Sequence, residues 1–320
     1  MEKSRLREIY KTALISRALD ERIWMLNRQG RAAIAASGQG HEISQLGCVE
    51  ALDSSRDHFL IYYRQFTLML ALGTTPEEQL RNFLAKDGDI MSGARQFPLH
   101  GSHPRVDLFS FSNVVATQLP QAVGVALADK MNNKDSVTIG FFGDGAASQG
   151  DCHEAMNFPS IHDLPVIFFC ENNGYAISVP LEKQMNIDNI SSRSSAYNIP
   201  GIQVDGTDFF SVYETTKQAV DRAKKGLGPT IIESKVERLL PHTTDDDHTK
   251  YRSSSDIEHM IERDPIPIFE NQLVDLGVIN KKDIEVLKKE VISIVNISTD
   301  KVENEAFPSL ENMLLHSDQN

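Results

Sequence analysis

Two short apolar runs, each followed by glycine and oxygen-bearing side chains, constrain the fold of this 320-residue chain more than any other feature. Residues 137–142 are largely apolar, with β-branched and aromatic side chains, and lead into residues 143–145, Gly-Asp-Gly. Residues 166–170 form a second such run, which leads into residues 172–175, Asn-Asn-Gly-Tyr. The segment between the runs is compatible with a helix. This order predicts strand, tight turn, helix and strand, the repeating unit of a parallel α/β sheet.

The ends of both predicted strands carry ligands suited to a hard cation. In open α/β sheets, ligands bind outside the carboxyl ends of the strands. Asp144 follows the first strand and Asn173 follows the second. Carboxylate and amide oxygens are ligands that Mg²⁺ accepts beside phosphate and water. A lone Gly-Asp-Gly turn would merely join a strand to a helix, but the amides that close the next strand favour a shared Mg²⁺ and the phosphates that it neutralises.

The residues around Asp144 also suit a phosphate ligand. Gly143 and Gly145 let the backbone turn sharply and approach a ligand without a Cβ in the way. We expect a helix to start near residues 147–149, where its free N–H groups would be available to a diphosphate.

The rest of the chain continues the alternation of strands and helices. A third unit is predicted as strand, helix and strand over residues 201–204, 209–225 and 230–236. Further helices are predicted over residues 14–27 with a stop at Gly30, after a Thr75 cap with Pro76 in the first turn, over residues 117–131, and over residues 281–297. Polar, aperiodic loops are expected over residues 84–103 and 239–255, the second of them mobile.

Together these elements predict the α/β class, with a parallel sheet flanked by helices and helical extensions at both ends. The economical division is a single domain over residues 1–320, with a core at roughly 105–240 and extensions at 1–85 and 255–320.

Composition excludes several functions. A net charge of −13, without a cluster of Lys and Arg, argues against a nucleic-acid surface. No run of about 18 apolar residues is present, so no membrane span is expected. The first residues lack a secretory apolar core and contain acids that a mitochondrial presequence avoids, which predicts a cytoplasmic protein. Cys48, Cys152 and Cys170 have no metal-ligand spacing and are expected to be structural.

The Gly-Asp-Gly and Asn-Asn pair, each at the end of a strand, is the signature of thiamine diphosphate enzymes. The chain resembles the α subunit of the thiamine diphosphate-dependent decarboxylating component of 2-oxo acid dehydrogenase complexes, most closely the branched-chain type. The resemblance covers roughly residues 14–315. It is carried by residues 28–31 (RQGR), Tyr63-Arg64, and residues 93–101 (GARQFPLHG), 116–124 (ATQLPQAVG), 172–178 (NNGYAIS), 242–252 (HTTDDDHTKYR) and 264–266 (DPI).

The resemblance implies a thiamine diphosphate-binding fold and a set of site residues. Mg²⁺ would be held by Asp144, Asn173 and the Tyr175 carbonyl. The cofactor would be contacted by Tyr63, Arg64, Asn113, Val115, Gly145, Ala146 and His242. His242 would also lie near the reacting centre as the catalytic residue of this chain. A potassium ion could bind the loop that contains Ser112, Val114, Thr117 and Gln118, and His100 could face the substrate.

Two positions depart from the branched-chain pattern, and one position touches regulation. Asn113 stands where a serine contacts the cofactor, and Glu171 stands where an arginine holds the diphosphate; pyruvate-type enzymes also have Glu there. These departures bear on the substrate more than on the cofactor. Thr243 replaces the serine that is phosphorylated in eukaryotic relatives, and no regulation is inferred from it or from the acidic residues 245–247.

The resemblance also implies partners. The cofactor supplies the electron sink for decarboxylation of a 2-oxo acid. A β subunit would supply the glutamate that contacts the aminopyrimidine, in an α₂β₂ tetramer that passes the acyl group to a lipoyl-bearing acyltransferase. Alternatives remain open at this point: pyruvate or acetoin as substrate, sugar phosphates as in a split transketolase, or a non-catalytic nucleotide-binding module.

Overall fold

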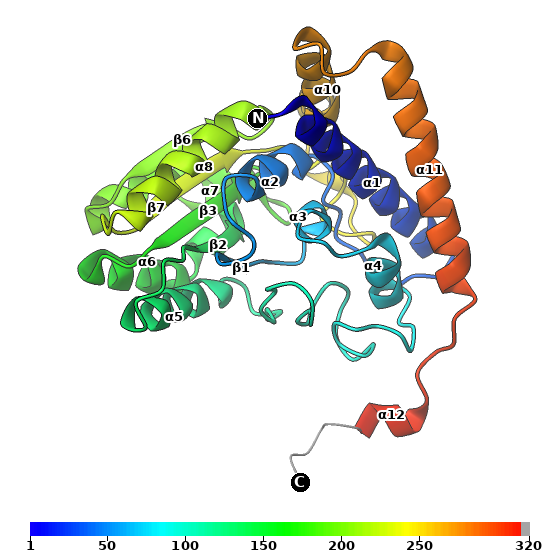
Figure 1. Cartoon of the computed structure of the whole chain (residues 1–320), viewed down its shortest axis with the longest axis horizontal. Helices are drawn as coiled ribbons and strands as arrows, with labels where there is room; N and C mark the ends of the chain where they lie inside the picture. Colours follow the sequence, from blue (N-terminus) through cyan, green and yellow to red (C-terminus); the bar gives the residue numbers. More distant parts are fainter. Residues whose placement is uncertain (315–320) are drawn as a thin grey trace.

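The centre of the computed structural model, which describes residues 1–314, is a five-stranded sheet with helices on both faces (Figure 1). All neighbouring strands run parallel. Their order across the sheet is β1 (His58–Leu60), β2 (Thr138–Gly143), β3 (Val166–Asn172), β7 (Thr230–Lys235) and β6 (Gly201–Asp205). The predicted α/β class with a helix-flanked parallel sheet is therefore confirmed. The last residues of the predicted C-terminal extension, 315–320, lie outside the described residues, and they include Leu315, where the resemblance ends.

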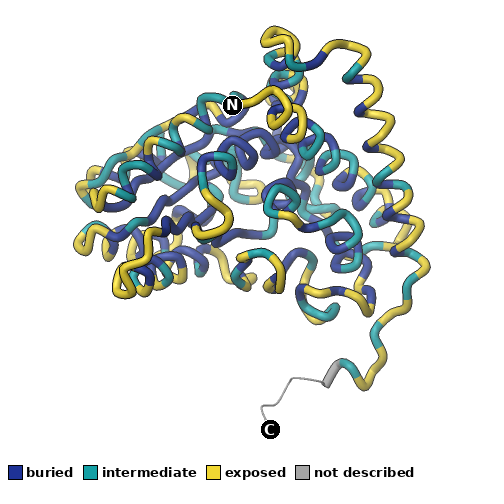
Figure 2. Tube along the Cα trace, in the orientation of Figure 1, coloured by how far each residue is buried: buried dark blue, intermediate teal, exposed yellow. Residues whose placement is uncertain are grey.

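Central strands β2 and β3 are buried on both faces, and alternate residues face different cores. Phe141 and Phe169 pack into the core beneath α2 (Glu42–Val49) and α8 (Phe209–Lys224). On the opposite face, side chains such as Phe142 and Cys170 pack against α5 (Gln118–Met131) and α6 (Gly150–His162). Figure 2 shows the strands as the darkest, most buried part of the trace, under helices whose outer faces are exposed. Strands that are buried on both faces have continuous apolar sequences, which is why these two strands could be predicted from the sequence.

The helices near the two ends of the chain lie side by side (Figure 1). Helix α1 (Lys3–Arg28) packs along α11 (Lys281–Glu303). Both are longer than predicted, because α1 already buries Leu6 and Ile9 in its first turns and α11 buries Val302 near its end. The other helices of this part are α3 (Phe66–Ala71), α4 (Pro76–Phe83), α9 (Ser254–Glu262), α10 (Pro265–Asp275) and α12 (Leu310–Leu314).

The remaining predictions were mostly right about element type. Thr75 caps α4 in a full capping box with Glu78. The described residues 84–103 contain only turns and bends and one isolated bridge, as expected of a loop. Strand β1 and the hairpin of β4 (Tyr175–Ala176) and β5 (Val179–Pro180) were not predicted, because strands of two or three residues carry no readable period. The short helices α7 (Leu181–Gln184), η2 (Ile190–Tyr197) and η3 (His248–Lys250) were not predicted either.

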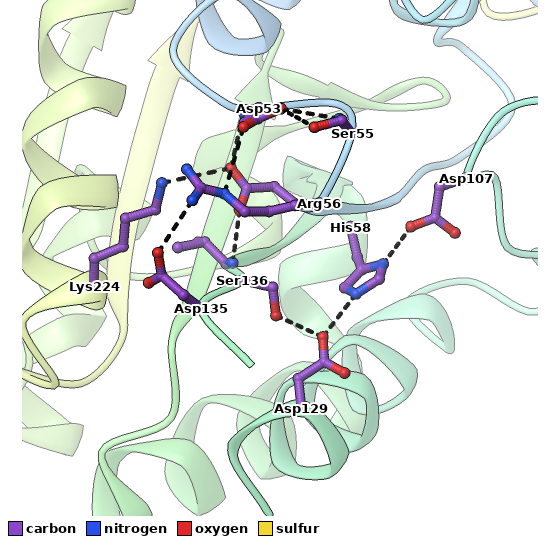
Figure 3. A network of polar contacts seen from close by, with 11 residues as sticks. Asp53, Ser55, Arg56, His58, Asp107, Asp129, Asp135, Ser136 and Lys224 are labelled. Atoms are coloured by element: carbon purple, nitrogen blue, oxygen red, sulfur yellow. Dashed lines mark hydrogen bonds and ion pairs between the residues drawn. The ribbon is translucent and has the colours of Figure 1, made fainter. Parts of the chain in front are cut away.

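At the amino-terminal edge of β1 and β2, a polar network ties the sheet to its surroundings (Figure 3). His58 contacts Asp107 through Nδ1, and its Nε2 lies 2.7 Å from Asp129 Oδ2 on α5. The buried Asp57 accepts a hydrogen bond of 2.9 Å from the Val137 backbone N–H. Hydrogen bonding to Asp107 raises the pKa of His58, although partial burial opposes that shift. This edge lies opposite the strand ends that carry the predicted site.

Among the described residues, no helix combines the length and the apolar character that a membrane span needs. All three cysteines are buried and free.

Candidate functional site

A cavity of about 260 Å³ opens at the carboxyl-terminal edge of the sheet. Segments that follow four neighbouring strands, together with the loop before α5, contribute to its wall. The lining residues are Tyr62, Tyr63, Arg64, Ser112, Asn113, Val114, Val115, Ala116, Gln118, Gly143, Asp144, Gly145, Ala146, Gln149, Asn173, Tyr175, Ala176, Ile177 and His242. The cavity therefore brings together every metal- or cofactor-binding residue predicted from the sequence except Thr117. This position matches the rule that ligands bind beyond the carboxyl ends of parallel strands.

Asp144 is the acidic residue of the cavity wall and is 1% exposed. Its Oδ2 accepts a hydrogen bond of 3.0 Å from Gln184 Nε2. Burial raises the pKa of Asp144, and the hydrogen bond from Gln184 opposes that shift. A bound cation would favour the ionised form and reverse the effect of burial.

Asn172 and Asn173 have different roles although they are adjacent. The Asn172 side chain is buried, donates to Glu233 at 2.7 Å and accepts from the Gly174 N–H at 2.9 Å. Asn173 lines the cavity, and its Oδ1 accepts only a long hydrogen bond of 3.3 Å from the Tyr175 N–H. The second asparagine is thus the one whose side chain is available to a ligand, and its role as a metal ligand stays a prediction.

The donor set near Asp144 suits Mg²⁺. No three His, Cys, Asp or Glu side chains of the described residues gather where they could hold a metal ion. A cation here would therefore rely on one carboxylate, the Asn173 amide oxygen and a backbone carbonyl such as that of Tyr175. Mg²⁺ commonly binds in this way, with phosphate and water completing its shell.

The backbone around Asp144 shows what its glycines do and where the next helix begins. Neither Gly143 nor Gly145 has a positive φ, so the turn does not demand glycine conformations. Gly145 is required for another reason, because a Cβ there would lie 2.9 Å from the Ala176 Cβ of the β4 hairpin. The helix start predicted near residues 147–149 agrees with α6, which begins at Gly150 with Gln149 as its N-cap, and a 3₁₀ segment, η1 (Asp144–Ser148), precedes it. The N–H groups nearest the cavity wall at Gly145 and Ala146 thus belong to η1.

Arg64 and His242 also line the cavity and contact each other. Arg64 is 2% exposed, and its Nη1 donates to the Ser37 carbonyl at 2.6 Å. Its Nη2 lies 3.2 Å from His242 Nδ1. A guanidinium can only donate, so Nδ1 must be the unprotonated nitrogen and Nε2 must carry the proton of the neutral ring. Burial and the positive charges of Arg64 and Arg238 lower the pKa of His242 to about 3.

Two further arginines, which the sequence did not single out as site residues, strengthen the positive charge. Arg238 is fully buried, donates to the Ile177 carbonyl at 2.9 Å and to the Tyr251 hydroxyl at 2.8 Å, and has its pKa lowered to about 10 by burial. Arg252 lies over the Tyr175 ring, with 4.4 Å from Cζ to the ring centroid. With Arg64 they form an electropositive shell suited to an anion such as a diphosphate. Only the position of Arg238, just beyond β7, could have drawn attention to it.

The residues of the expected potassium loop bond to one another. The Val114 N–H donates to Ser112 Oγ at 3.0 Å, and Thr117 Oγ1 donates to the Val114 carbonyl at 3.0 Å. Gln118 Nε2 donates to the Phe141 carbonyl at 2.7 Å. Ser112, Val114 and Gln118 line the cavity and Thr117 does not.

Two other residues discussed from the sequence lie outside the cavity wall. His100 bonds to the Pro98 carbonyl at 3.0 Å and lies beside Phe111, with 4.4 Å between ring centroids. Glu171, the departure from the branched-chain pattern, is buried on the sheet face that carries Phe169 and does not reach the cavity.

Comparison with known proteins extends over most of the chain. The sequence profile of the family described as "Dehydrogenase E1 component" matches residues 10–311. The chain is 41% identical over 307 residues to "2-oxoisovalerate dehydrogenase subunit alpha" of Bacillus subtilis (strain 168), which covers 96% of this chain and 93% of that protein.

Two more relatives are named for different substrates, one for a branched-chain 2-oxo acid and one for pyruvate. "3-methyl-2-oxobutanoate dehydrogenase subunit alpha" of Mycobacterium tuberculosis (strain ATCC 25618 / H37Rv) is 37% identical over 85% of this chain and 71% of its own length. "Pyruvate dehydrogenase E1 component subunit alpha" of Staphylococcus aureus (strain Mu50 / ATCC 700699) is 38% identical over 88% of this chain and 74% of its own length. The resemblance found in the sequence is confirmed.

Proposed function

Because the chain belongs to the dehydrogenase E1 component family, as part of a thiamine diphosphate-dependent 2-oxo acid dehydrogenase, we propose that it is the α subunit of the branched-chain type. One observation carries the proposal. A single cavity is lined by the Asp144 carboxylate and the Asn173 amide together with the Arg64 guanidinium and the neutral His242 ring. That arrangement suits a diphosphate neutralised by Mg²⁺.

Each part of the cavity has a role toward the cofactor. Asp144, Asn173 and the Tyr175 carbonyl would hold Mg²⁺. Gly145 and Ala146 would contact the diphosphate through their backbone N–H groups. The Arg64 guanidinium, beside Tyr63, would contact it as well. Asn113 and Val115 would contact the cofactor from the loop before α5. When bound, thiamine diphosphate supplies an electron sink for decarboxylation.

His242 would act as a hydrogen-bond donor toward the reacting centre. Its ring is neutral at physiological pH because burial, and then the charges of Arg64 and Arg238, lower its pKa. With Nδ1 facing those guanidiniums, Nε2–H is the group free to donate to a developing negative charge. A fixed donor of this kind needs no reorganisation during the reaction.

A partner subunit is needed to complete the site. Asp144 is the only carboxylate among the described residues that line the cavity, and in this proposal it binds Mg²⁺. The acid that contacts the aminopyrimidine must then come from elsewhere. Apolar side chains of the cavity wall are also exposed, with Val114 at 64% and Ile177 at 56%. Both features support a β subunit that closes the cavity in an α₂β₂ tetramer, which would pass the acyl group to a lipoyl-bearing acyltransferase.

The branched-chain assignment follows the relatives named above, and pyruvate is the second candidate because a pyruvate-type subunit is 38% identical. A bound K⁺ is a further proposal, supported by Ser112, Val114 and Gln118 on the cavity wall.

The test is CO₂ release from labelled 4-methyl-2-oxopentanoate and from pyruvate by the chain co-purified with its β subunit. Each acid is assayed with and without thiamine diphosphate and Mg²⁺. Cofactor-dependent release that favours the branched acid supports the proposal. Release that favours pyruvate moves the assignment to the second candidate, and no cofactor-dependent release from either acid overturns both.

A further inference from the structure

Glu171 is a buried acid that the proposed mechanism does not use. It is 0% exposed and lies at the carboxyl end of β3, opposite Gly143 of β2. Its Oε1 accepts a hydrogen bond of 3.0 Å from Gln45 Nε2, and its Oε2 accepts one of 3.2 Å from Gln65 Nε2. His41 Nδ1 lies 3.3 Å from Oε1. Both glutamines and His41 are also fully buried, so solvent cannot replace these contacts.

The two glutamines hold the backbone segment that carries the cofactor-binding Tyr63 and Arg64. Gln65 Oε1 accepts from the Tyr62 N–H at 2.9 Å. Gln45 Nε2 donates to the Arg64 carbonyl at 3.3 Å, and Gln45 Oε1 accepts from the Leu68 N–H at 3.1 Å. The backbone on both sides of Tyr63 is therefore fixed by buried amides rather than by a sheet ladder.

An amide side chain can point either way, because its oxygen accepts and its nitrogen donates. The Glu171 oxygens require the nitrogen of each glutamine to face them. Each glutamine oxygen must then face a backbone N–H, that of Tyr62 for Gln65 and that of Leu68 for Gln45. Reversing either amide would set two donors against each other in the interior.

We propose that Glu171 is a positioning residue, which fixes the direction of the Gln45 and Gln65 amides and so holds Tyr63 and Arg64 against the cofactor cavity. This inference rests on the proposed function, since it assumes that the cavity binds thiamine diphosphate. In this role Glu171 acts through Gln45 and Gln65 and does not itself contact the diphosphate.

The first test is Glu171→Gln in the complex with the β subunit. A glutamine offers one oxygen where the carboxylate offers two, so one of the two facing amides must turn and leave a buried N–H unpaired. A lost buried pairing of this kind corresponds to a factor of about ten or more in binding. The Kd of thiamine diphosphate, measured by tryptophan fluorescence or calorimetry without substrate, is expected to rise by that factor. The kcat at saturating cofactor should change much less.

The decisive variant exchanges the acid and the amide, as Glu171→Gln with Gln65→Glu. The new amide at position 171 would donate to the new carboxylate at position 65 and accept from Gln45, while that carboxylate accepts from the Tyr62 N–H. The cofactor Kd should return to within about threefold of the wild type, although Gln65→Glu alone, which sets two carboxylates together, should be impaired. The four proteins form a double-mutant cycle.

The outcomes separate this inference from the proposed function. A wild-type complex that binds no thiamine diphosphate overturns the proposed function. If the wild type binds, an unchanged Kd in Glu171→Gln overturns the inference, and so does an exchanged double variant as weak as that single variant. The thermal midpoint of the cofactor-free complex is recorded for all four proteins. A fall in midpoint that accompanies an unchanged Kd would assign Glu171 to stability alone.

Discussion

Arg64 Nη2 lies 3.2 Å from His242 Nδ1, and this contact sets the tautomer of the histidine and adds to the burial that keeps the ring neutral. The two residues come from segments 178 positions apart in the sequence, which follow β1 and β7. The Tyr63 ring completes the group, with its centroid 6.2 Å from that of His242. The chemistry of the site therefore depends on how the segments that follow two non-adjacent strands of the sheet approach each other.

His242 should make the stability of the protein depend on acid pH. Its folded pKa is lowered from 6.5 to about 3, so between these values the unfolded chain binds a proton that the folded chain does not. The contribution of His242 to the free energy of unfolding should rise with pH across that window, by about 2 kcal/mol between pH 5 and pH 7. Denaturant unfolding of the wild type and His242→Asn at both pH values measures it. Parallel behaviour of the two proteins would contradict the assignment.

His58 should act in the opposite direction. Its contacts with Asp107 and Asp129 raise its folded pKa, so the folded chain holds a proton that the unfolded chain releases above pH 6.5 (Figure 3). The stabilisation is full below that pH and is lost as pH rises through the raised pKa. The midpoint difference between the wild type and His58→Gln should therefore shrink from pH 6 to pH 9. Asp107→Asn should flatten that dependence, since Asp107 is the main cause of the shift.

Asp144→Asn should have two effects of opposite sign. Removal of a buried charge relieves the penalty that raises the Asp144 pKa, so the metal-free protein should melt at a higher temperature. Mg²⁺ affinity should fall by about a hundredfold, because the one carboxylate of the site is lost. Mn²⁺ titration followed by electron paramagnetic resonance measures the affinity. The exposed Asp275→Asn serves as the control and should change neither quantity. A variant that is weaker in both respects would indicate a structural role.

Gly145→Ala and Gly150→Ala should differ in sign. A Cβ on Gly145 would lie 2.9 Å from the Ala176 Cβ, so the β4 hairpin must move, which should lower stability by about 1–3 kcal/mol. A Cβ on Gly150, in the first turn of α6, meets no atom within 4 Å, and alanine is the better helix former there by up to about 1 kcal/mol. Thermal unfolding of both variants decides the matter. Equal destabilisation would mean that the hairpin contact is not limiting.

Some parts of the fold could be predicted from the sequence and others could not. The central strands were predicted because their burial on both faces gives unbroken apolar runs. Strand β1 was missed because its three residues are too few to show a period. The start of α1 was misplaced although Leu6, Ile9 and Tyr10 already follow helical spacing among charged neighbours.

The site divides in the same way. Asp144 and Asn173 could be predicted because each follows a legible strand. Arg238 was not predicted, since its place just beyond β7 was the only signal and no local pattern tells a buried arginine from an exposed one. From the sequence, Glu171 was compared with an arginine that binds the diphosphate. In the structure its side chain lies on the sheet face that carries Phe169 and does not reach the cavity. The face of the sheet to which a side chain at the end of a strand points depends on the register of that strand. The register is fixed only when the strand pairs with its neighbours.

The packing of α1 against α11 has a consequence for synthesis on the ribosome. Leu19 and Ile23 of α1 share a core with Val295 and Val302 of α11, so the first helix gains this partner only after nearly 300 residues have been made. At typical elongation rates this takes roughly fifteen to sixty seconds. Until then α1 can pack against α2 and α3, so only the apolar stripe that α11 later covers stays open on the nascent chain. Such a stripe is the kind of surface that holding chaperones bind. The demand for chaperones should therefore fall sharply once α11 leaves the exit tunnel.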